Sequence, residues 1–224
     1  PLSACLADDV PGVRQAAVEL LTRLLPSGPG FAVEAVAAIL GHPRACARDA
    51  AHGILVKVGR EGAGAGALVA QYVGPRMSHL DEAVRGAAVR TLSAIAAVAA
   101  MDVVHIVEGG LEHEDAGVRA AAVEVAAALG RAVGRGKRQI TSALEGHAFS
   151  SSAPERTAAV TALGHVVAKR PSRARDRVEQ CLADADVGVR DAAVAALVSI
   201  LPRQDASETA HVAQQLPHAA GAER

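Results

Sequence analysis

The apolar and polar positions of this chain repeat along its whole length, and one short pattern marks each unit. An arginine, any residue and two alanines follow one another six times, beginning at Arg14, Arg48, Arg85, Arg119, Arg156 and Arg190. Successive arginines are separated by 34, 37, 34, 37 and 34 residues. A period of this length is typical of stacked helix-pair repeats. The pattern therefore predicts an all-α array in which each unit contacts mainly its neighbours.

Each unit contains two helical patterns, here named helix A and helix B, joined by a short turn. In helix B the residues three, four, seven, ten and eleven positions after the arginine are nearly all apolar and share one face, which we expect to form the core. The residues one, five and nine positions after it vary freely and are expected to face solvent. The predicted B helices are 11–25, 43–58, 81–98, 115–129, 153–168 and 186–201. The predicted A helices are 31–40, 66–78, 101–110, 137–145, 172–183 and 206–216.

These units predict one array over residues 1–224, with about six helix pairs and an incomplete repeat at each end. Pro75 is expected to shorten its A helix, and the glycine-rich stretch 61–66 is expected to be a flexible linker. Neither end has the polar cap that usually covers a terminal repeat, so we expect a piece of a longer array. The repeats are approximately 1–25, 29–59, 66–98, 101–130, 137–168, 172–201 and a partial 205–224.

Composition narrows the class of protein. Aromatic residues are 1% of the chain and tryptophan is absent, so alanine, valine and leucine must supply the core. The net charge of -1 argues against a general polyanion binder. No apolar stretch is long enough to span a bilayer, and a soluble, intracellular protein of cytoplasm or nucleus is favoured. Cys5, Cys46 and Cys181 are widely spaced and odd in number, which argues against a disulfide framework and a zinc module. Cys5 and Cys181 lie on an apolar helix face and are expected to pack in the core.

The pattern L-x-D-x-x-x-x-VR-x-AA, seen in Leu182 to Ala193, resembles the HEAT-repeat family, including armadillo-like and PBS-lyase-type relatives. The resemblance implies a right-handed superhelix of antiparallel helix pairs, with B helices lining the concave side. It also implies a structural ladder between neighbouring repeats, in which an acid of the turn pairs with each motif arginine. A cation at a helix N-terminus opposes the macrodipole and calls for such a carboxylate. The expected acids are Asp8 or Asp9, Asp81, Asp115, and Asp184 or Asp186; the second repeat has His42 instead.

No catalytic, cofactor-binding or metal-binding constellation is found in the sequence. Four histidines lie six residues before an arginine of the repeat: His42, His79, His113 and His218. Stacked helices are about 8–10 Å apart, whereas zinc ligands lie about 2 Å from the metal, so these histidines are predicted to be turn residues. Deoxyhypusine hydroxylase has similar repeats with several His-Glu pairs, but this chain has the single pair His113-Glu114 in such a turn. HEAT-like alkylpurine DNA glycosylases depend on aromatic surfaces that are lacking here.

Two surfaces are candidates for binding a macromolecule. The first is the variable B-helix face, where the expected partner-binding residues are Glu19, Arg23, Lys57, Arg90, Glu124, Thr161 and His165. Their charges nearly cancel, which suits a protein better than nucleic acid. The second is a basic edge at two successive inter-repeat turns, made of Arg131, Arg135, Lys137, Arg138, Lys169, Arg170, Arg173, Arg175 and Arg177. Complementarity to helix dipoles is the alternative explanation of this edge.

The functional prediction is a non-enzymatic scaffold or adaptor that mediates protein-protein interaction. One alternative is recognition of an acidic protein, RNA or an anionic lipid surface by the basic edge. The other is a HEAT-type enzyme or cofactor carrier, such as a protein similar to the bilin lyases. No small-molecule substrate is evident, and the sequence does not identify the protein partner.

Overall fold

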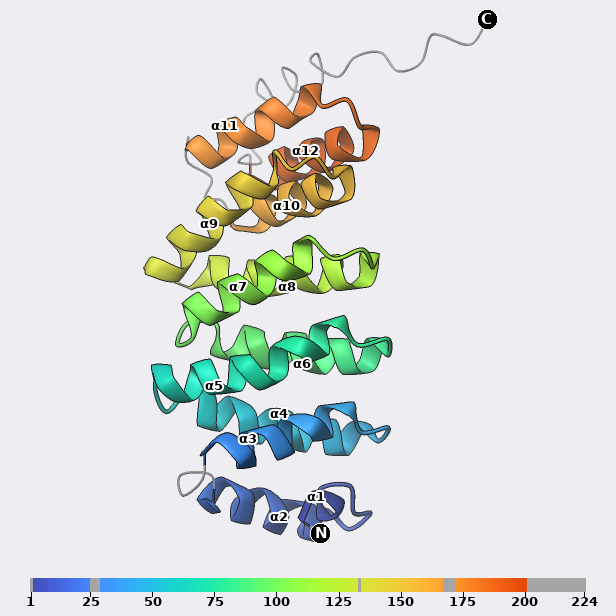
Figure 1. The fold of residues 1–224 in the computed structure, drawn as a ribbon, viewed down its shortest axis with the longest axis vertical. Coiled ribbons are helices and arrows are strands. Elements are labelled where there is room, and N and C mark those ends of the chain that lie inside the picture. Colours follow the sequence, from blue (N-terminus) through green and yellow to red (C-terminus); the bar gives the residue numbers. More distant parts are fainter. Residues whose placement is uncertain (1, 25–28, 133, 167–171, 201–224) are drawn as a thin grey trace, which may run out of the picture.

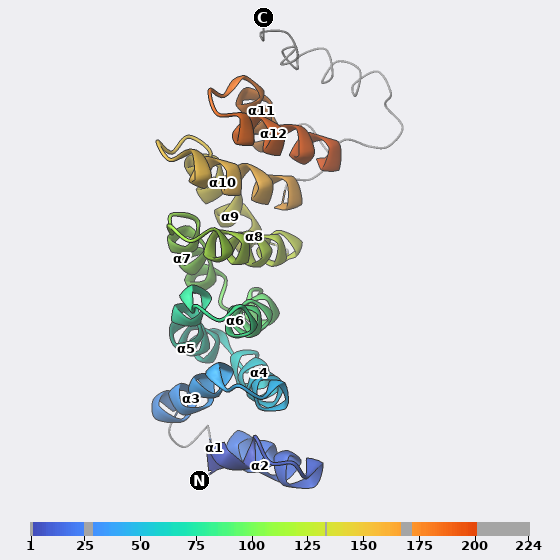
Figure 2. The ribbon, with the colours of Figure 1, turned by 90° about the vertical axis from the view of Figure 1, so that its right-hand side faces the viewer.

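The computed structural model describes residues 2–24, 29–132, 134–166 and 172–200, and within these ranges the regular structure is helical, without strands. The helices pair and stack along one long axis, as Figure 1 shows. Figure 2 shows that the A helices form one layer and the B helices a second layer beside it. The chain is thus an all-α solenoid.

The two layers alternate strictly along the chain. The A layer contains α1 (Leu2–Cys5), α3 (Pro29–Ala38), α5 (Ala63–Val73), α7 (Ala100–Leu111), α9 (Arg135–His147) and α11 (Arg173–Gln180). The B layer contains α2 (Pro11–Leu24), α4 (Ala45–Gly59), α6 (Glu82–Ile95), α8 (Ala116–Arg131), α10 (Ala153–Val166) and α12 (Val187–Ile200). Single 3-10 turns follow three of the A helices: η2 (Ile39–Gly41), η3 (Gly74–Ser78) and η4 (Cys181–Ala183).

The predicted helices agree with these bounds to within a few residues, apart from the predicted A helix 206–216, which lies outside the described residues together with the partial repeat 205–224. The expected effect of Pro75 is confirmed, because α5 ends at Val73 and continues only as η3. The expected flexible linker at 61–66 is wrong. Helix α5 begins at Ala63, and Gly66 is buried within it. A Cβ on Gly66 would lie 3.0 Å from the carbonyl oxygen of Gly59, so the glycine serves close helix packing rather than flexibility.

The predicted core face of the B helices is confirmed by its burial. Seven positions after the arginine, Leu55, Leu92, Leu163 and Leu197 are all 0% exposed. Most of the positions predicted to face solvent are exposed or half-buried, but Ala128 is buried. Cys181 also belongs to the core, and burial raises the pKa of its thiol, which favours the unreactive protonated form.

Two glycines allow neighbouring B helices to approach each other closely. A Cβ on Gly130 of α8 would lie 2.9 Å from the Cα of Val166, and a Cβ on Gly164 of α10 would lie 2.9 Å from the Cα of Ala196. Backbone atoms cannot move aside as a flexible side chain can. Gly130 is near the predicted end of its B helix. In the structure it lies inside α8, where it allows close packing.

Each motif arginine holds the turn that precedes its own helix. Its Nη1 donates to the backbone carbonyls six and five residues earlier, at distances between 2.7 and 3.1 Å. For Arg119 these acceptors are the carbonyls of His113 and Glu114. The partial negative charges of these turn carbonyls thus stabilise the arginine cation, which the positive end of the helix dipole would otherwise repel. The arginines therefore lock turns within a repeat in addition to any contact between repeats.

The expected pairing of turn acids with motif arginines between neighbouring repeats is seen directly at one rung, formed by Arg156 and Asp184. Within the described residues, the motif arginine with side-chain hydrogen bonds to a carboxylate is Arg156, whose Nε and Nη2 donate to Asp184 at 2.9 and 2.8 Å. This bond lowers the pKa of the Asp184 carboxyl. Asp81 and Asp115 instead accept from backbone amides at the start of α6 and α8. The two roles are compatible, because Asp184 accepts from the amide of Asp186 as well as from Arg156.

The turn histidines act as hydrogen-bond acceptors. The Nδ1 atoms of His42, His79 and His113 accept from the backbone N–H two residues later at 3.0–3.1 Å. Asp8 and Asp184 accept in the same way at the same repeat position. The imidazole therefore replaces an aspartate in an Asx-like turn, which is the turn role predicted for these three histidines. His218 lies outside the described residues.

Candidate functional site

Three open grooves follow one another along the B-helix face. The first, of about 260 Å³, lies between α2 and α4 and is lined by Glu19, Arg23 and Lys57 among others. The central groove, of about 720 Å³, crosses α4, α6, α8 and α10. The third, of about 440 Å³, lies between α8 and α10 and shares Val123 and Glu124 with the central groove. The second and third grooves therefore form one continuous depression across four repeats.

The central groove combines an apolar floor with charged and polar side chains. Val89, Ala94 and Val123 supply apolar surface, whereas Arg90, Glu124, Arg131, His52 and His165 supply the polar groups. Arg90 is held by an ion pair with Asp49 at 2.9 Å, which joins α6 to α4. Both side chains of this pair remain more than half exposed, so they can be approached by a partner. Such a surface, with apolar contact area beside fixed charges, is typical of a protein-binding site.

His52 is oriented by the one buried polar residue of the described core, Thr91. The Thr91 hydroxyl donates to the carbonyl of Ala87 at 2.8 Å, so it accepts from His52 Nδ1 at 3.0 Å. His52 is therefore the tautomer with its hydrogen on Nδ1. Burial, and secondly the charge of Arg90, lower the pKa of His52. A neutral imidazole thus presents Nε2 as an acceptor at the groove.

All seven residues predicted for the B-helix face line one of the grooves. Glu19, Arg23 and Lys57 line the first groove. Arg90, Glu124 and His165 line the central groove, and Thr161 lines the third. Their binding role stays a prediction, but the structure places them on one side of the molecule in a continuous series.

Sequence reasoning did not assign two basic residues, His52 and Arg131, to the central groove. His52 lies four positions after Arg48, where the repeat pattern places a core residue, and a polar residue at an apolar position was the available signal. Arg131 was assigned to the basic edge, although it lines the central groove. It is the last residue of α8, and the helix end directs it to the B-helix face.

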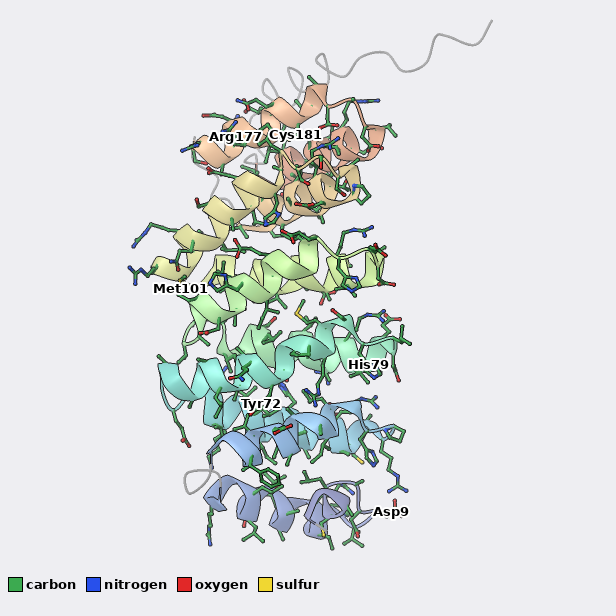
Figure 3. The ribbon with its side chains drawn as sticks, in the orientation of Figure 1. Asp9, Tyr72, His79, Met101, Arg177 and Cys181 are labelled. Carbon is green, nitrogen blue, oxygen red and sulfur yellow. The ribbon has the colours of Figure 1, made fainter. Side chains whose placement is uncertain are left out.

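The rest of the basic edge lies at the opposite end of the A helices from the acidic A–B turns. In Figure 3 Asp9 and His79 mark the edge with the A–B turns, and Arg177 lies toward the other side. Arg135, Lys137 and Arg138 lie in the first turn of α9, and Arg173 and Arg175 lie in the first turn of α11. Lys169 and Arg170 lie outside the described residues. Cations at a helix N-terminus oppose the macrodipole, so dipole complementarity does not explain these five residues.

Several cations of this edge have partners within the chain. Arg173 lies 3.4 Å from Glu145 of α9, and Arg175 is hydrogen-bonded to Glu179 at 3.0 Å. Arg177 donates to Gln180 and lies over the Phe149 ring, 4.5 Å from its centroid. The charge of the α11 part of the edge is therefore partly neutralised. Arg135 and Arg138 are exposed in α9.

Comparison with known proteins agrees with the repeat architecture. The family model described as "HEAT repeat associated with sister chromatid cohesion" matches residues 2–21 and 175–197. None of the curated proteins matches the sequence. No helix within the described part of the chain is long and apolar enough to cross a membrane.

Solved structures with similar folds are repeat proteins. A chain from the structure in which Kap95p binds RanGDP is similar with a TM-score of 0.54 and 16% identity, over 89% of this chain and 28% of that one. The archaeal HEAT-like repeats protein from Thermococcus onnurineus NA1 gives a TM-score of 0.46 and 12% identity, over 99% of this chain and 90% of that one. A designed armadillo repeat protein in complex with the peptide (KR)4 gives a TM-score of 0.40 and 14% identity, over 89% of this chain and 98% of that one.

The stacked helix pairs and the turn-locking arginines define the class: the protein is an α-solenoid. Its repeats resemble HEAT repeats, whose family model matches residues 2–21 and 175–197, and a fold of this type typically serves as a scaffold for protein interactions.

Proposed function

We propose that this solenoid is a non-enzymatic scaffold that binds a protein partner along its B-helix face. The observation that carries the proposal is the continuous depression formed by the central and third grooves, which share Val123 and Glu124. Repeat solenoids use extended surfaces of this kind for binding. The groove residues vary from repeat to repeat, whereas the core and turn residues recur, so the variable positions are the ones that can encode specificity.

The chemistry of the depression favours a protein segment that carries both charges and apolar side chains. Arg90 and Arg131 attract carboxylates, and Glu124 attracts a cation. Val89, Ala94 and Val123 offer an apolar strip between them. Alternating charges of this kind fix the register of a partner more than they raise its affinity. Nucleic acid is disfavoured at this surface, because Glu19 and Glu124 would lie against phosphates.

Exchange of groove charges for neutral side chains tests the proposal. The groove variant combines Glu19→Gln, Arg23→Gln, Arg90→Gln and Glu124→Gln, which leaves the net charge unchanged. Partners crosslinked to the full-length protein in its native extract are then quantified by mass spectrometry for wild type and variant. We expect the groove variant to lose specific partners while its circular dichroism and melting temperature stay close to wild type.

The basic edge provides the comparison variant, with Arg135→Gln, Lys137→Gln and Arg138→Gln. The proposal predicts that this edge variant keeps the partners that the groove variant loses. Loss of those partners in the edge variant alone would move the binding surface to the basic edge. Retention of the same partners by both variants would overturn the proposal. A bound chromophore or metal that co-purifies at one equivalent and is required for activity would favour the class of HEAT-type enzymes or cofactor carriers.

A further inference from the structure

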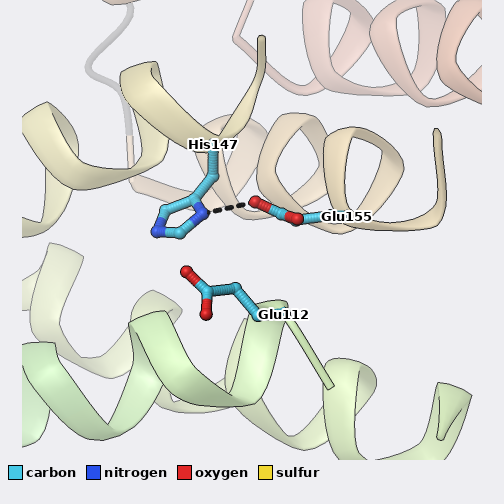
Figure 4. A group of neighbouring side chains, drawn as sticks. All are labelled: Glu112, His147 and Glu155. Carbon is cyan, nitrogen blue, oxygen red and sulfur yellow. Dashed lines mark hydrogen bonds and ion pairs between the residues drawn. The ribbon is translucent and has the colours of Figure 1, made fainter. Parts of the chain in front are cut away.

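Three side chains with metal-ligating atoms meet where two neighbouring repeats join. Glu112 is the residue that follows α7, His147 ends α9, and Glu155 lies in the first turn of α10. One ligand atom from each lies within 4.8 Å of the other two. Figure 4 shows the His147 ring and the Glu155 carboxylate side by side, with the Glu112 carboxylate approaching them from the preceding repeat. The group is named here the Glu112/His147/Glu155 cluster.

Glu155 departs from the repeat pattern in a way that packing does not explain. It directly precedes its motif arginine. Helices α4, α6, α8 and α12 have Ala47, Val84, Val118 and Val189 at this position, with exposed fractions of 0, 1, 2 and 0%, whereas Val13 of the first B helix, α2, is 37% exposed. The Glu155 side chain is 14% exposed. A carboxylate at a core position loses hydration that must be replaced by hydrogen bonds or a cation.

The side chains around Glu155 replace only part of that hydration. His147 Nδ1 lies 2.7 Å from Glu155 Oε1, and Ser150 Oγ donates to Glu155 Oε2 at 2.7 Å. His147 is itself only 14% exposed. The nearest motif arginine, Arg156, has its hydrogen bonds directed to the carbonyls of residues 150 and 151 and to Asp184. Two carboxylates therefore lie near one imidazole, which is hydrogen-bonded to Glu155, and the cluster carries excess negative charge when both acids are ionised.

We propose that the Glu112/His147/Glu155 cluster binds a divalent transition-metal ion, for which zinc is the test ion. One imidazole nitrogen and two carboxylate oxygens form a donor set that suits zinc. The metal takes the place of the hydrogen between His147 and Glu155, so their separation widens from 2.7 Å to about 3.3 Å when both bonds are about 2 Å long. Glu112 is exposed, and its flexible side chain closes the remaining gap.

The surroundings have two further properties of a metal site. Ser150 holds the second oxygen of Glu155, as outer-shell donors do for carboxylates that ligate metals. The three ligands also come from two repeats: Glu112 follows α7, His147 ends α9 and Glu155 lies in α10, so one ion would join the A–B turn of one repeat to the A–B turn of the next. The stability of an array depends on such interfaces between neighbours. Metal binding is therefore expected to raise the melting temperature.

Titration of the full chain, without a polyhistidine tag and after treatment with a chelator, tests the site. Zinc binding is measured by calorimetry, and cobalt(II) absorption reports the geometry of the ligands. We expect one ion per chain and a higher melting temperature with zinc. Loss of an outer-shell partner weakens metal sites about 10–100-fold, and loss of a direct ligand weakens them no less. Glu112→Gln and His147→Gln should therefore weaken binding by at least about tenfold.

Glu114→Gln is the matched control, because Glu114 is an exposed carboxylate in the same turn as Glu112. It should bind zinc as the wild type does. Glu112→Gln keeps the hydrogen bonds between His147, Ser150 and Glu155, so weak binding by this variant cannot be attributed to misfolding. Absence of zinc binding by the wild type, or equal affinities of Glu112→Gln and wild type, would overturn the proposal and leave the cluster as a hydrogen-bonded network.

Discussion

Helices α8 and α10 begin with the same motif but use it differently. Arg119 and Arg156 both donate to the carbonyls six and five residues earlier, yet Arg156 adds two bonds to Asp184 of the next repeat. The residue before the arginine is the buried Val118 in α8 and Glu155 in α10. The shared residues build the repeat, and the differing residues give each repeat its own contacts.

The two helices also differ eight positions after the arginine. In α8 this residue is Ala127, which lines the central groove. In α10 it is Gly164, against which the backbone of α12 packs, and Ser199 Oγ donates to the Gly164 carbonyl at 2.9 Å. At this position α8 has the methyl group of Ala127 on an open surface, whereas α10 has no side chain at Gly164 and is in close contact with α12. Gly164→Ala and Asp184→Asn test how much two of these differences contribute to stability, and a third substitution concerns the turn histidine His42.

The largest effect is expected for Gly164→Ala, which gives α10 the residue that α8 has. The added Cβ would lie 2.9 Å from both Cα and Cβ of Ala196, so α10 and α12 must separate. Such overpacking costs about 1–3 kcal/mol. We expect the free energy of unfolding, measured by denaturant titration with far-ultraviolet circular dichroism, to fall by this amount.

Gly86→Ala in α6 is the control, because a Cβ at Gly86 meets no neighbouring atom within 4 Å. This variant should be stabilised by about 0.5–1 kcal/mol, since alanine is the better helix former. If Gly164→Ala were stabilised to the same extent, the close contact between α10 and α12 would not require glycine.

A smaller effect is expected for Asp184→Asn, which removes the charge from the inter-repeat bond that distinguishes Arg156 from Arg119. The asparagine can still accept the turn hydrogen bond from the amide of Asp186, so the change is restricted mainly to the pair with Arg156. Bonds assisted by charge are about twice as strong as neutral ones. The free energy of unfolding should fall by about 1–2 kcal/mol at neutral pH.

The same variant has an expected pH dependence. The hydrogen bonds from Arg156 lower the pKa of Asp184 in the folded protein, so the unfolded chain binds its proton at higher pH. The contribution is complete above the ordinary pKa of an aspartate and is lost as pH falls through the folded pKa. Wild type and Asp184→Asn should therefore differ at neutral pH and converge as the pH falls through the lowered folded pKa of Asp184. Asp49→Asn, which breaks the exposed pair with Arg90, should cost under about 1 kcal/mol.

A smaller effect than that of Asp184→Asn is expected in the turn preceding α4, where histidine replaces aspartate. His42→Ala removes the acceptor of the Arg44 amide and should lower the free energy of unfolding by about 0.5–1.5 kcal/mol. His42→Asp supplies the carboxylate that Asp184 uses at the same repeat position and should match wild type. A His105→Ala control, on the exposed face of α7, should be nearly silent. Equal stability of both His42 variants would show that the acceptor is unimportant.

Repetition made most of the fold predictable. The six copies of the arginine motif determine where each B helix begins, and the apolar positions after it determine the buried face. The bonds of each arginine to two carbonyls could not be predicted, because backbone acceptors leave no mark in the sequence. The linker prediction failed for a related reason. Glycine permits both flexibility and close packing, and only the position of Gly59 beside Gly66 distinguishes them.

The candidate sites were predictable to different degrees. The groove residues of the B-helix face follow from helical periodicity alone, because positions that avoid the core must face outward. Arg131 and His52 could be assigned to the groove only from the positions of neighbouring repeats, which periodicity does not provide. At the position before the motif arginine, Glu155 is an acid where the other repeats have valine or alanine, so the sequence alone distinguishes it. Its neighbours His147 and Glu112 are 8 and 43 residues away in the chain. Their convergence depends on how two turns stack.

The locality of the arginine bonds has a consequence for how such arrays change in evolution. In every described repeat, Nη1 of the arginine reaches acceptors within its own unit, five and six residues back. Duplication or deletion of one whole unit leaves each remaining arginine with both acceptors. Recombination between units can therefore lengthen or shorten the array without breaking a turn. Such events do break charged pairs that span two units, as Arg156 with Asp184 and Arg90 with Asp49 do.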